Sequence, residues 1–332
     1  MEIEAGPILS FREQKKKASK HFWEVSILVV VALAFKELFK IEGLDAKKKV
    51  LYTDANSCFL RFDLSIEQGK TEKSVNYQIH NHTYAFTVPG TATSLHFGFA
   101  SCNGFSDLSL MKDIKNRSIM WERLQETHEN KKYHILILGG DQVYADTVWS
   151  DVPSVREWKN LPLERRRLES TNAAMEAELD NYYAKLYKRI WGYAPVQQTL
   201  ASIPTLMMWD DHEIFDGFGS YPDADQNCPV YQKIYEIARK YFLLFQQHIS
   251  PDETEKRPGM LCSFSNISLG FKVNQYLILL LDLRSQRTQK GIITHENWNA
   301  IFAWNETIKS GQYFHLLLVT SIPIVYPNFV FL

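Results

Sequence analysis

The chain has little cysteine for its length, four in 332 residues, and no two of them form a Cys-x-x-Cys pair. Their scatter argues against a structural zinc knot, which needs closely spaced thiolates. A chain this long also has no need of a disulfide framework. We therefore expect reduced thiols, at Cys58, Cys102, Cys228 and Cys262.

The chain also lacks an excess of positively or negatively charged residues. Lysine and arginine number 37 against 38 aspartate and glutamate, a formal net charge of -1. Nucleic-acid binding depends on a basic surface, so this balance gives no reason to expect it. The clusters 15–17 and 47–49 are too short to change that, and solvated surface explains them.

No targeting or membrane-spanning segment stands out. The most apolar run, residues 26–35, is about half of the roughly 20 residues that a transmembrane helix needs. Its β-branched residues favour a buried strand. The first residues lack the basic start and apolar core of a secretory signal. These absences, together with the scattered thiols, predict a cytoplasmic protein without a membrane span.

The pattern of hydrophobic residues changes near Pro89-Gly90, a turn signal. Short strand-like pieces such as 59–64 and 83–88 precede it and predict a small β-sandwich domain over residues 1–92. Beyond it, strands alternate with helices, which predicts an α/β domain over 93–332. The expected helices cover 118–129, 170–200 and 231–248, the expected later strands 276–283 and 313–319, and 148–167 is expected to form a loop.

Polar residues follow three apolar segments that we expect to be strands. Residues 95–100 lead to Cys102, residues 133–138 lead to Asp141 and Tyr144, and residues 203–208 lead to Asp210-Asp211-His212-Glu213. Chemistry in α/β proteins is usually placed at the carboxyl ends of strands. An acidic surface turn with a chance histidine would explain the last motif alone. Three such strand ends favour a convergent site.

Carboxylates and imidazole are metal ligands, and a pair of metal ions assists phosphate-ester cleavage by polarising oxygens and activating water. Glycines 139 and 140 allow a sharp turn that presents the carboxylate of Asp141 outward. A thiolate at Cys102 and a phenolate at Tyr144 would suit ferric iron better than magnesium. For Cys102, a small buried thiol in the core is the competing interpretation.

The chain from about Ala100 onward resembles the PhoD-like branch of the calcineurin-type metallophosphoesterases. The resemblance rests on residues 100–103, 140–146, 209–213, 281–284 and 321–327, in the family's order. It implies an α/β/β/α layered sandwich, preceded here by the β-sandwich, and a metal-dependent alkaline phosphatase or phosphodiesterase acting on a phosphate-ester substrate. The sequence indicates neither which ester nor which oligomeric state.

The resemblance also implies roles for individual residues. Cys102 and Tyr144 would bind Fe3+, Asp141 would bridge the metals, and Asp211 would bind Ca2+, although a different divalent pair is possible. His212 would stay off the metals and face the substrate as the catalytic residue, either donating a proton to the leaving oxygen or stabilising the phosphoryl oxygens. Asp210 and Glu213 would orient the ligands. No individual role is expected for three neighbouring acids, Asp107, Asp146 and Asp216.

Two features of the second half of the chain complete the expectations. Arg284 could bind phosphate or pair with Asp282, and we favour the ion pair. The family closes its metal site with C-terminal histidines in a Gly-Asp-x-His or Gly-His-x-His element. Here the later histidines lack that context: His248 ends a helix, His295 precedes one, and His315 is expected in the core.

We therefore expect a chain truncated at its C-terminus, with weak or absent hydrolysis by itself. One alternative is a non-catalytic relative that binds metal or a phosphorylated partner. Another is a separate polypeptide that supplies the missing part.

Overall fold

The computed structural model describes residues 3–35, 43, 45–79, 81–105, 108–251, 257–262, 265–309, 311 and 313–324. Asp107 and residues 325–327, which the sequence analysis considers, lie outside these ranges.

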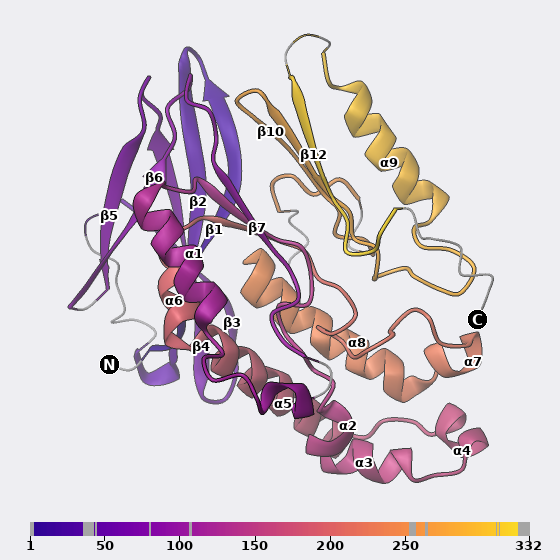
Figure 1. The fold of residues 1–332 in the computed structure, drawn as a ribbon. Helices are drawn as coiled ribbons and strands as arrows, with labels where there is room; N and C mark the ends of the chain where they lie inside the picture. Colours follow the sequence, from indigo (N-terminus) through magenta and orange to yellow (C-terminus); the bar gives the residue numbers. More distant parts are fainter. Residues whose placement is uncertain are drawn as a thin grey trace.

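The fold is mixed α/β and is organised around one large mixed sheet (Figure 1). The sheet has seven strands in the order β3-β4-β2-β1-β9-β8-β7. Their bounds are β1 Ile3–Lys17, β2 Lys20–Ala32, β3 Lys47–Thr53, β4 Ser57–Glu67, β7 Phe97–Ala100, β8 Ile135–Leu138 and β9 Thr205–Met207.

Two smaller sheets complete the strands. A hairpin is formed by β5 (Lys73–Ile79) and β6 (His82–Val88). A three-stranded sheet contains β10 (Leu269–Val273), β11 (Tyr276–Leu280) and β12 (His315–Val319). In it, β11 and β12 run parallel, with α9 between them in sequence.

Helices pack around these sheets. Their bounds are α1 Ile119–Asn130, α2 Val148–Asp151, α3 Pro153–Lys159, α4 Leu163–Leu168, α5 Ala173–Trp191, α6 Ala194–Leu200, α7 Asp223–Gln226, α8 Pro229–Phe242 and α9 His295–Glu306. Short 3-10 turns occupy Leu33–Phe35 and Leu108–Met111, and a π-helical turn, Leu243–Gln247, continues α8. Among the described residues, no helix is both long and apolar enough to span a bilayer.

The predicted small β-sandwich is not confirmed as a separate unit. Strands β1 to β4 lie in the same sheet as β7 to β9, because Ser10 of β1 pairs with Thr205 of β9. Of the apolar run 26–35 that was expected to be a strand, residues 26–32 lie in β2, and 33–35 form a 3-10 turn. One hydrophobic core includes residues from both sides of the predicted boundary, such as Val29 and Leu136. The boundary between residues 92 and 93 stays a prediction, and the large sheet crosses it.

The expected loop over 148–167 is wrong, because this segment forms α2, α3 and the start of α4. Pro153 occupies the start of α3, where a missing N–H costs nothing. Val148, Val155 and Trp158 are buried, and these apolar contacts hold the segment in place.

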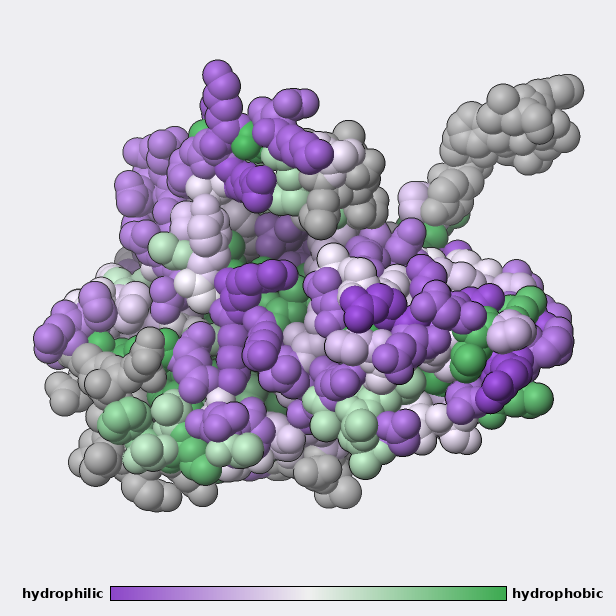
Figure 2. All heavy atoms as spheres, turned by 90° about the horizontal axis from the view of Figure 1, so that it is seen from below, coloured by the Kyte–Doolittle hydropathy of each residue, from purple (hydrophilic) through white to green (hydrophobic). Residues whose placement is uncertain are grey.

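The molecular face seen from below is predominantly hydrophilic, with smaller hydrophobic areas between the polar ones (Figure 2).

Candidate metal centre

The parallel strands β7, β8 and β9 bring the predicted residues to one edge of the large sheet. β7 pairs in parallel with β8, and β8 with β9, so all three strands end on the same side. Backbone hydrogen bonds continue past the strand ends, from Cys102 N to Gly140 O (3.0 Å) and from Asn103 N to Asp141 O (2.7 Å). The strand-end segments that carry the predicted ligands are therefore adjacent.

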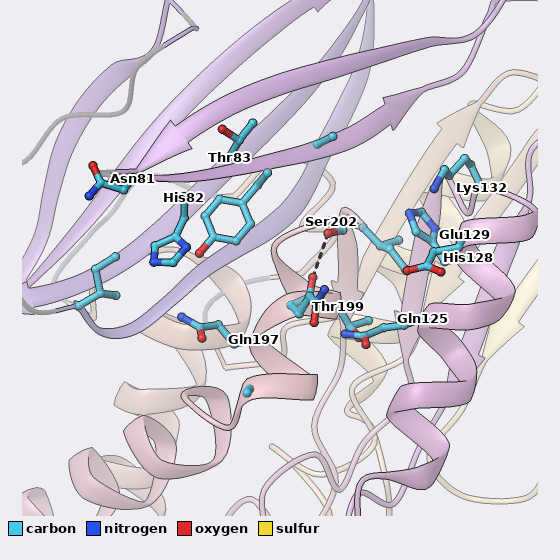
Figure 3. Close-up of a pocket in the computed structure, with 16 residues that line it drawn as sticks. Asn81, His82, Thr83, Gln125, His128, Glu129, Lys132, Gln197, Thr199 and Ser202 are labelled. Carbon is cyan, nitrogen blue, oxygen red and sulfur yellow. Dashed lines mark hydrogen bonds between the residues drawn. The ribbon is translucent and has the colours of Figure 1, made fainter.

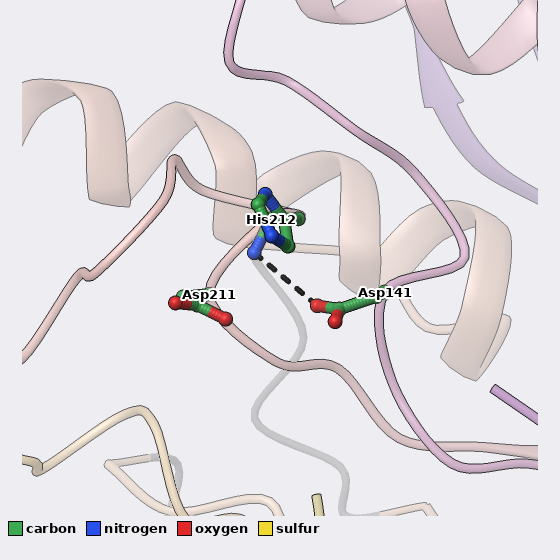
Figure 4. Close-up of side chains that lie close together, drawn as sticks. All are labelled: Asp141, Asp211 and His212. Carbon is green, nitrogen blue, oxygen red and sulfur yellow. Dashed lines mark hydrogen bonds between the residues drawn. The ribbon is translucent and has the colours of Figure 1, made fainter. Parts of the chain in front are cut away.

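Three side chains form a cluster with the spacing of a metal site. One ligand atom from each of Asp141, Asp211 and His212 lies within 4.8 Å of the others. Figure 4 shows the two carboxylates and the imidazole turned toward one another, with Asp141 on one loop and the other two on the next. Asp141 and Asp211 are thus where the sequence analysis placed them. His212, expected to stay off the metals, is close enough to be a third ligand.

The turn after β8 has an unusual backbone. Gly140 has φ +120°, and a Cβ there would lie 2.9 Å from Asp210 Cβ. Asp141 and Cys102 also have positive φ, +57° and +59°, although both carry side chains. Such conformations cost free energy and are often found at functional sites. The expected glycine turn is confirmed, and it presents Asp141 toward the cluster.

The carboxylates concentrate negative charge at the cluster. Burial, together with the charge of Asp210, raises the pKa of Asp141 to about 6. Cys102 Sγ lies 3.5 Å from Asp141 Oδ2, and Cys102 is exposed, which excludes the buried-thiol interpretation. Its pKa is raised, first by the partial burial of the sulfur and also by Asp141. A cation at this place would offset both effects.

Glu213 organises the backbone beneath the cluster. Its fully buried carboxylate accepts hydrogen bonds from the N–H groups of Asp141 (3.0 Å), Gln142 (2.7 Å) and Asp210 (2.8 Å). Burial and the charge of Asp141 raise its pKa to about 8, although these hydrogen bonds act in the opposite direction. The carboxylate thereby ties the turn after β8 to the segment after β9.

His212 is held by a carboxylate that sequence reasoning left without a role. Its Nδ1 lies 2.8 Å from Asp146 Oδ2, and its ring stacks on Tyr144 with centroids 4.3 Å apart. Burial lowers the pKa of His212, but Asp146 and the other carboxylates outweigh it and raise the value to about 9. Burial and nearby carboxylates raise the pKa of Tyr144. The only sequence signal for Asp146 is its place in the motif of Asp141.

The expected ion pair between Arg284 and Asp282 is wrong. The guanidinium of Arg284 pairs instead with Asp210 and, at 3.3 Å, with Asp211 Oδ1. Asp282 accepts from Trp209 Nε1 (3.0 Å) and from backbone N–H groups, which leaves it no need of a cation. A buried carboxylate requires hydrogen bonds or a counterion, and the hydrogen bonds of the buried Asp282 leave Arg284 available to pair with the buried Asp210.

β12 also reaches the site. Ser321, which follows this strand, donates its hydroxyl hydrogen to Asp210 Oδ1 at 2.9 Å. The segment after the neighbouring strand β11 carries Arg284, so both parallel strands of the small sheet contribute to the surroundings of Asp210. The residues expected to orient the ligands, Asp210 and Glu213, are both buried beside them.

The later histidines lie away from the cluster. His248 caps the π-helical turn and is fully buried against Ser26, and His295 begins α9. His315 was expected in the core, but its side chain is exposed. It shares a face of β12 with Leu317 and Val319, and that face becomes buried only toward the end of the strand. No described histidine after His212 takes part in the described ligand cluster.

A separate pocket of about 1300 Å3 opens between β6, α1 and α6 (Figure 3). Several polar side chains of different kinds line it, including the amides of Gln125 and Gln197, the imidazoles of His82 and His128, and the ammonium group of Lys132. None of the predicted metal ligands lines it. The pocket is therefore distinct from the candidate metal centre.

The donors present fit a bound cation. Two carboxylates and an imidazole suit divalent or trivalent metals, and the thiol of Cys102 adds a softer donor beside them. Burial, and after it the neighbouring carboxylates, raise the pKa of Asp141, and a cation bound at the cluster would lower it again. Arg284 supplies part of that charge, on the side of Asp210 and Asp211.

Comparison with known proteins shows similarity to a phosphatase family, to a yeast protein and to a solved structure. A family model described as "PhoD related phosphatase" matches residues 64–331. "Uncharacterized protein YGR266W" of Saccharomyces cerevisiae is 28% identical over 321 residues, which is 86% of this chain and 45% of the yeast protein. A solved structure titled "Structure of PhoD" aligns with a TM-score of 0.51 at 12% identity, over 94% of this chain and 61% of that one. The chain thus spans less than two thirds of either protein.

Proposed function

Because the chain belongs to the family of PhoD-related phosphatases, we propose that it carries the cation-binding site of a metal-dependent phosphoric ester hydrolase. The observation that carries this proposal is that the carboxylates of Asp141 and Asp211 meet at the ends of parallel strands, with the imidazole of His212 beside them. When bound there, metal ions would polarise the phosphoryl oxygens of a phosphate ester and lower the pKa of water.

The chain's own residues divide the remaining work. Asp141, projecting from its strained turn, would bridge two metal ions, and Asp211 would hold one of them. Glu213 accepts the backbone N–H groups of Asp141 and of Asp210, the residue before Asp211, and so helps to fix both positions. The ion pair of Asp210 with Arg284 would keep the neighbouring carboxylates oriented.

His212 would serve as the acid that protonates the leaving oxygen of the ester. Nδ1 of His212 is hydrogen-bonded to Asp146, so Nε2 is the ring nitrogen that would face the substrate. Stacking on Tyr144 restricts rotation of the imidazole. Although burial lowers the pKa of His212, Asp146 and the other carboxylates raise it to about 9, so the imidazole carries a proton at neutral pH that it can donate.

We further propose that the ions are Fe3+ and Ca2+, with iron held by Cys102 and Tyr144 beside Asp141. The proximity of Cys102 Sγ to Asp141 Oδ2 supports a shared ion. Purified protein loaded with ferric iron should then show a visible phenolate-to-iron absorption band. Tyr144→Phe should remove the band, and a band unchanged in that variant would contradict the assignment.

The order of layers implied by the resemblance, α/β/β/α, also remains our inference. It is supported by the packing of Phe11 in β1 on Phe271 in β10, with ring centroids 5.6 Å apart, which brings the two larger sheets together. On the small sheet, Trp304 of α9 lies against Gly270 of β10.

A second candidate is a protein that binds metal or a phosphorylated partner without hydrolysing it. One observation favours it: both oxygens of Asp211 already have partners, Arg284 at 3.3 Å and the N–H of Gly217 at 2.7 Å. A carboxylate engaged in this way would bind a second ion weakly.

Metal titration and hydrolysis, measured on the same samples, separate the candidates. The chain and its Asp141→Asn variant are titrated with Mn2+, Ca2+ and Fe3+, and tested on an aryl phosphate and its diester. Binding and turnover that both fail in Asp141→Asn support the hydrolase. Binding without turnover supports the second candidate. Absence of metal binding by the unaltered chain would refute both metal-binding interpretations.

A further inference from the structure

A second charged cluster lies inside the protein, beside β1 and β2. It contains Arg12, Arg61, His248 and Arg257, which are 7%, 8%, 0% and 1% exposed. None of them belongs to the candidate metal centre. Cationic side chains are seldom buried unless an acceptor or counterion compensates them, so this cluster requires an explanation.

The geometry makes Arg257 and His248 neighbours. Ser10 of β1 and Ser26 of β2 are directly paired across the antiparallel ladder. Arg257 Nη2 donates to Ser10 Oγ (3.0 Å) and Phe11 O (2.8 Å), and His248 Nδ1 lies 2.9 Å from Ser26 Oγ. Opposed residues of such a ladder have Cα atoms about 4.5–5.5 Å apart. The guanidinium and the imidazole are thus anchored side by side.

The other two arginines are engaged with acceptors. Arg61 pairs with Asp63 at 2.9 Å and donates to His248 O at 2.8 Å. Arg12 donates to Gln247 O at 2.8 Å. These bonds fasten the buried segment 246–248 to the sheet. They do not supply a counterion for Arg257.

Arg257 and His248 retain donors without acceptors. Arg257 Nε and Nη1 and His248 Nε2 are buried and have no hydrogen-bond partner in the described part of the chain. Burial and the charge of Arg12 push the pKa of Arg257 down, yet a guanidinium stays charged in proteins. Burial and the three arginines also hold the pKa of His248 well below its usual value, so its ring is neutral. If Ser26 donates to Nδ1, the ring carries its hydrogen on Nε2 and is a donor there.

We propose that Arg257 and His248 bind one small inorganic anion of the halide class, enclosed between the β1–β2 ladder and segment 246–250. A spherical anion accepts several N–H groups without a fixed direction, which matches the fork of Arg257 together with an imidazole N–H. Since Arg257 and His248 are enclosed, the site excludes phosphate esters and other large anions. The anion is structural and is not the substrate.

The position of this site gives the anion a further effect. Gln246, two residues before His248, donates to Glu213 Oε1 at 3.3 Å, and Gln247 donates to Met207 O at 2.7 Å. The segment that the anion would secure therefore touches both β9 and the carboxylate beneath the metal ligands.

The test compares anions at constant ionic strength. Thermal unfolding of the full chain is followed while sodium methanesulfonate is replaced stepwise by sodium bromide or chloride. A ligand that binds only the folded state raises Tm with its concentration, here by about 2–4 °C at saturating halide. Arg257→Met should abolish the halide dependence, whereas Arg165→Met, which alters an exposed arginine of α4, should keep it.

A second measurement covers the case in which Arg257→Met fails to fold. Crystals of the unaltered chain grown in bromide should give one anomalous peak between the Arg257 guanidinium and His248 Nε2. Halide-independent unfolding of the unaltered chain, equal halide dependence in Arg257→Met, or a protein carboxylate at Arg257 in that crystal would each overturn the proposal.

Discussion

Asp146 accepts a hydrogen bond from Nδ1 of His212 at 2.8 Å and also accepts the backbone N–H of Asp216 at 2.8 Å. The carboxylate therefore fixes both the orientation of the imidazole and the hydrogen position on its ring. Groups that orient metal-site or catalytic histidines in this way contribute strongly to affinity and activity.

Asp146→Asn should weaken function without unfolding the protein. The amide cannot stabilise the charged imidazole, so we expect metal affinity or hydrolysis to fall about 10–100-fold. Metal titration and aryl phosphate turnover measure the loss. Asp216→Asn is the control, since its backbone N–H to Asp146 is kept. Equal losses in the two variants would contradict a specific role for Asp146.

Arg284→Met should destabilise the fold, because it leaves Asp210 as a buried carboxylate without its counterion. Breaking such a pair from one side costs about 3–5 kcal/mol of unfolding free energy. Urea unfolding gives the value. The double variant Arg284→Met with Asp210→Leu should recover part of the loss. If the double variant is as unstable as the sum of the single changes, the ion pair is not the cause.

Gly140→Ala should also lower stability. The new Cβ would meet Asp210 Cβ at 2.9 Å, and φ +120° is strained for any L side chain. We expect a loss of about 1–3 kcal/mol, together with displacement of Asp141. Gly291→Ala is the matched control, since a Cβ at Gly291 would have no atom within 4 Å and the φ there is ordinary. A neutral Gly140→Ala would show that the turn tolerates a side chain.

His128 should make stability fall in acid. Burial, together with Lys132 and His134, lowers its pKa to about 4, and its Nδ1 accepts the N–H of Tyr133 at 3.0 Å. His128 takes up a proton near pH 6.5 in the unfolded chain and only near pH 4 in the folded chain. The stabilisation of the folded chain by neutral His128 is therefore fully present above pH 6.5. It decreases as pH falls from about 6.5 to 4.

Urea unfolding between pH 7.5 and pH 4.5 measures this effect as a slope of unfolding free energy. In His128→Gln, the slope should be smaller over the same interval, by about 1–2 kcal/mol in total after allowance for partial exposure. An unchanged slope would assign the acid sensitivity to other groups.

Much of the site could be predicted from sequence because it lies at strand ends. The apolar runs before Asp141 and Asp211 are long enough to be recognised as strands, and their parallel pairing brings the two carboxylates together. Asp146 could not be assigned, since several nearby acids look equivalent and only the fold selects the one beside His212.

The errors arise where tertiary contacts outweigh local pattern. Proximity in sequence favours Asp282 as the partner of Arg284, but the buried Asp210 takes that place. The apolar neighbours of His315 predict a core residue, yet β12 exposes it. The parallel pairing of β1 with β9 joins residues almost 200 positions apart, which no local signal indicates.

That long-range pairing decides how the polypeptide can be dissected. Thr205 Oγ1 donates to Leu9 O at 2.7 Å, in addition to the pairing of Ser10 with Thr205. A recombinant fragment that starts after Pro89-Gly90 would leave one edge of β9 without its neighbouring strand and would lose both hydrogen-bond acceptors of Arg257, Ser10 Oγ and Phe11 O. Such a fragment should be recovered in inclusion bodies, whereas a protease that cleaves the folded chain at the exposed Ala92 or Ser94 should leave both pieces associated.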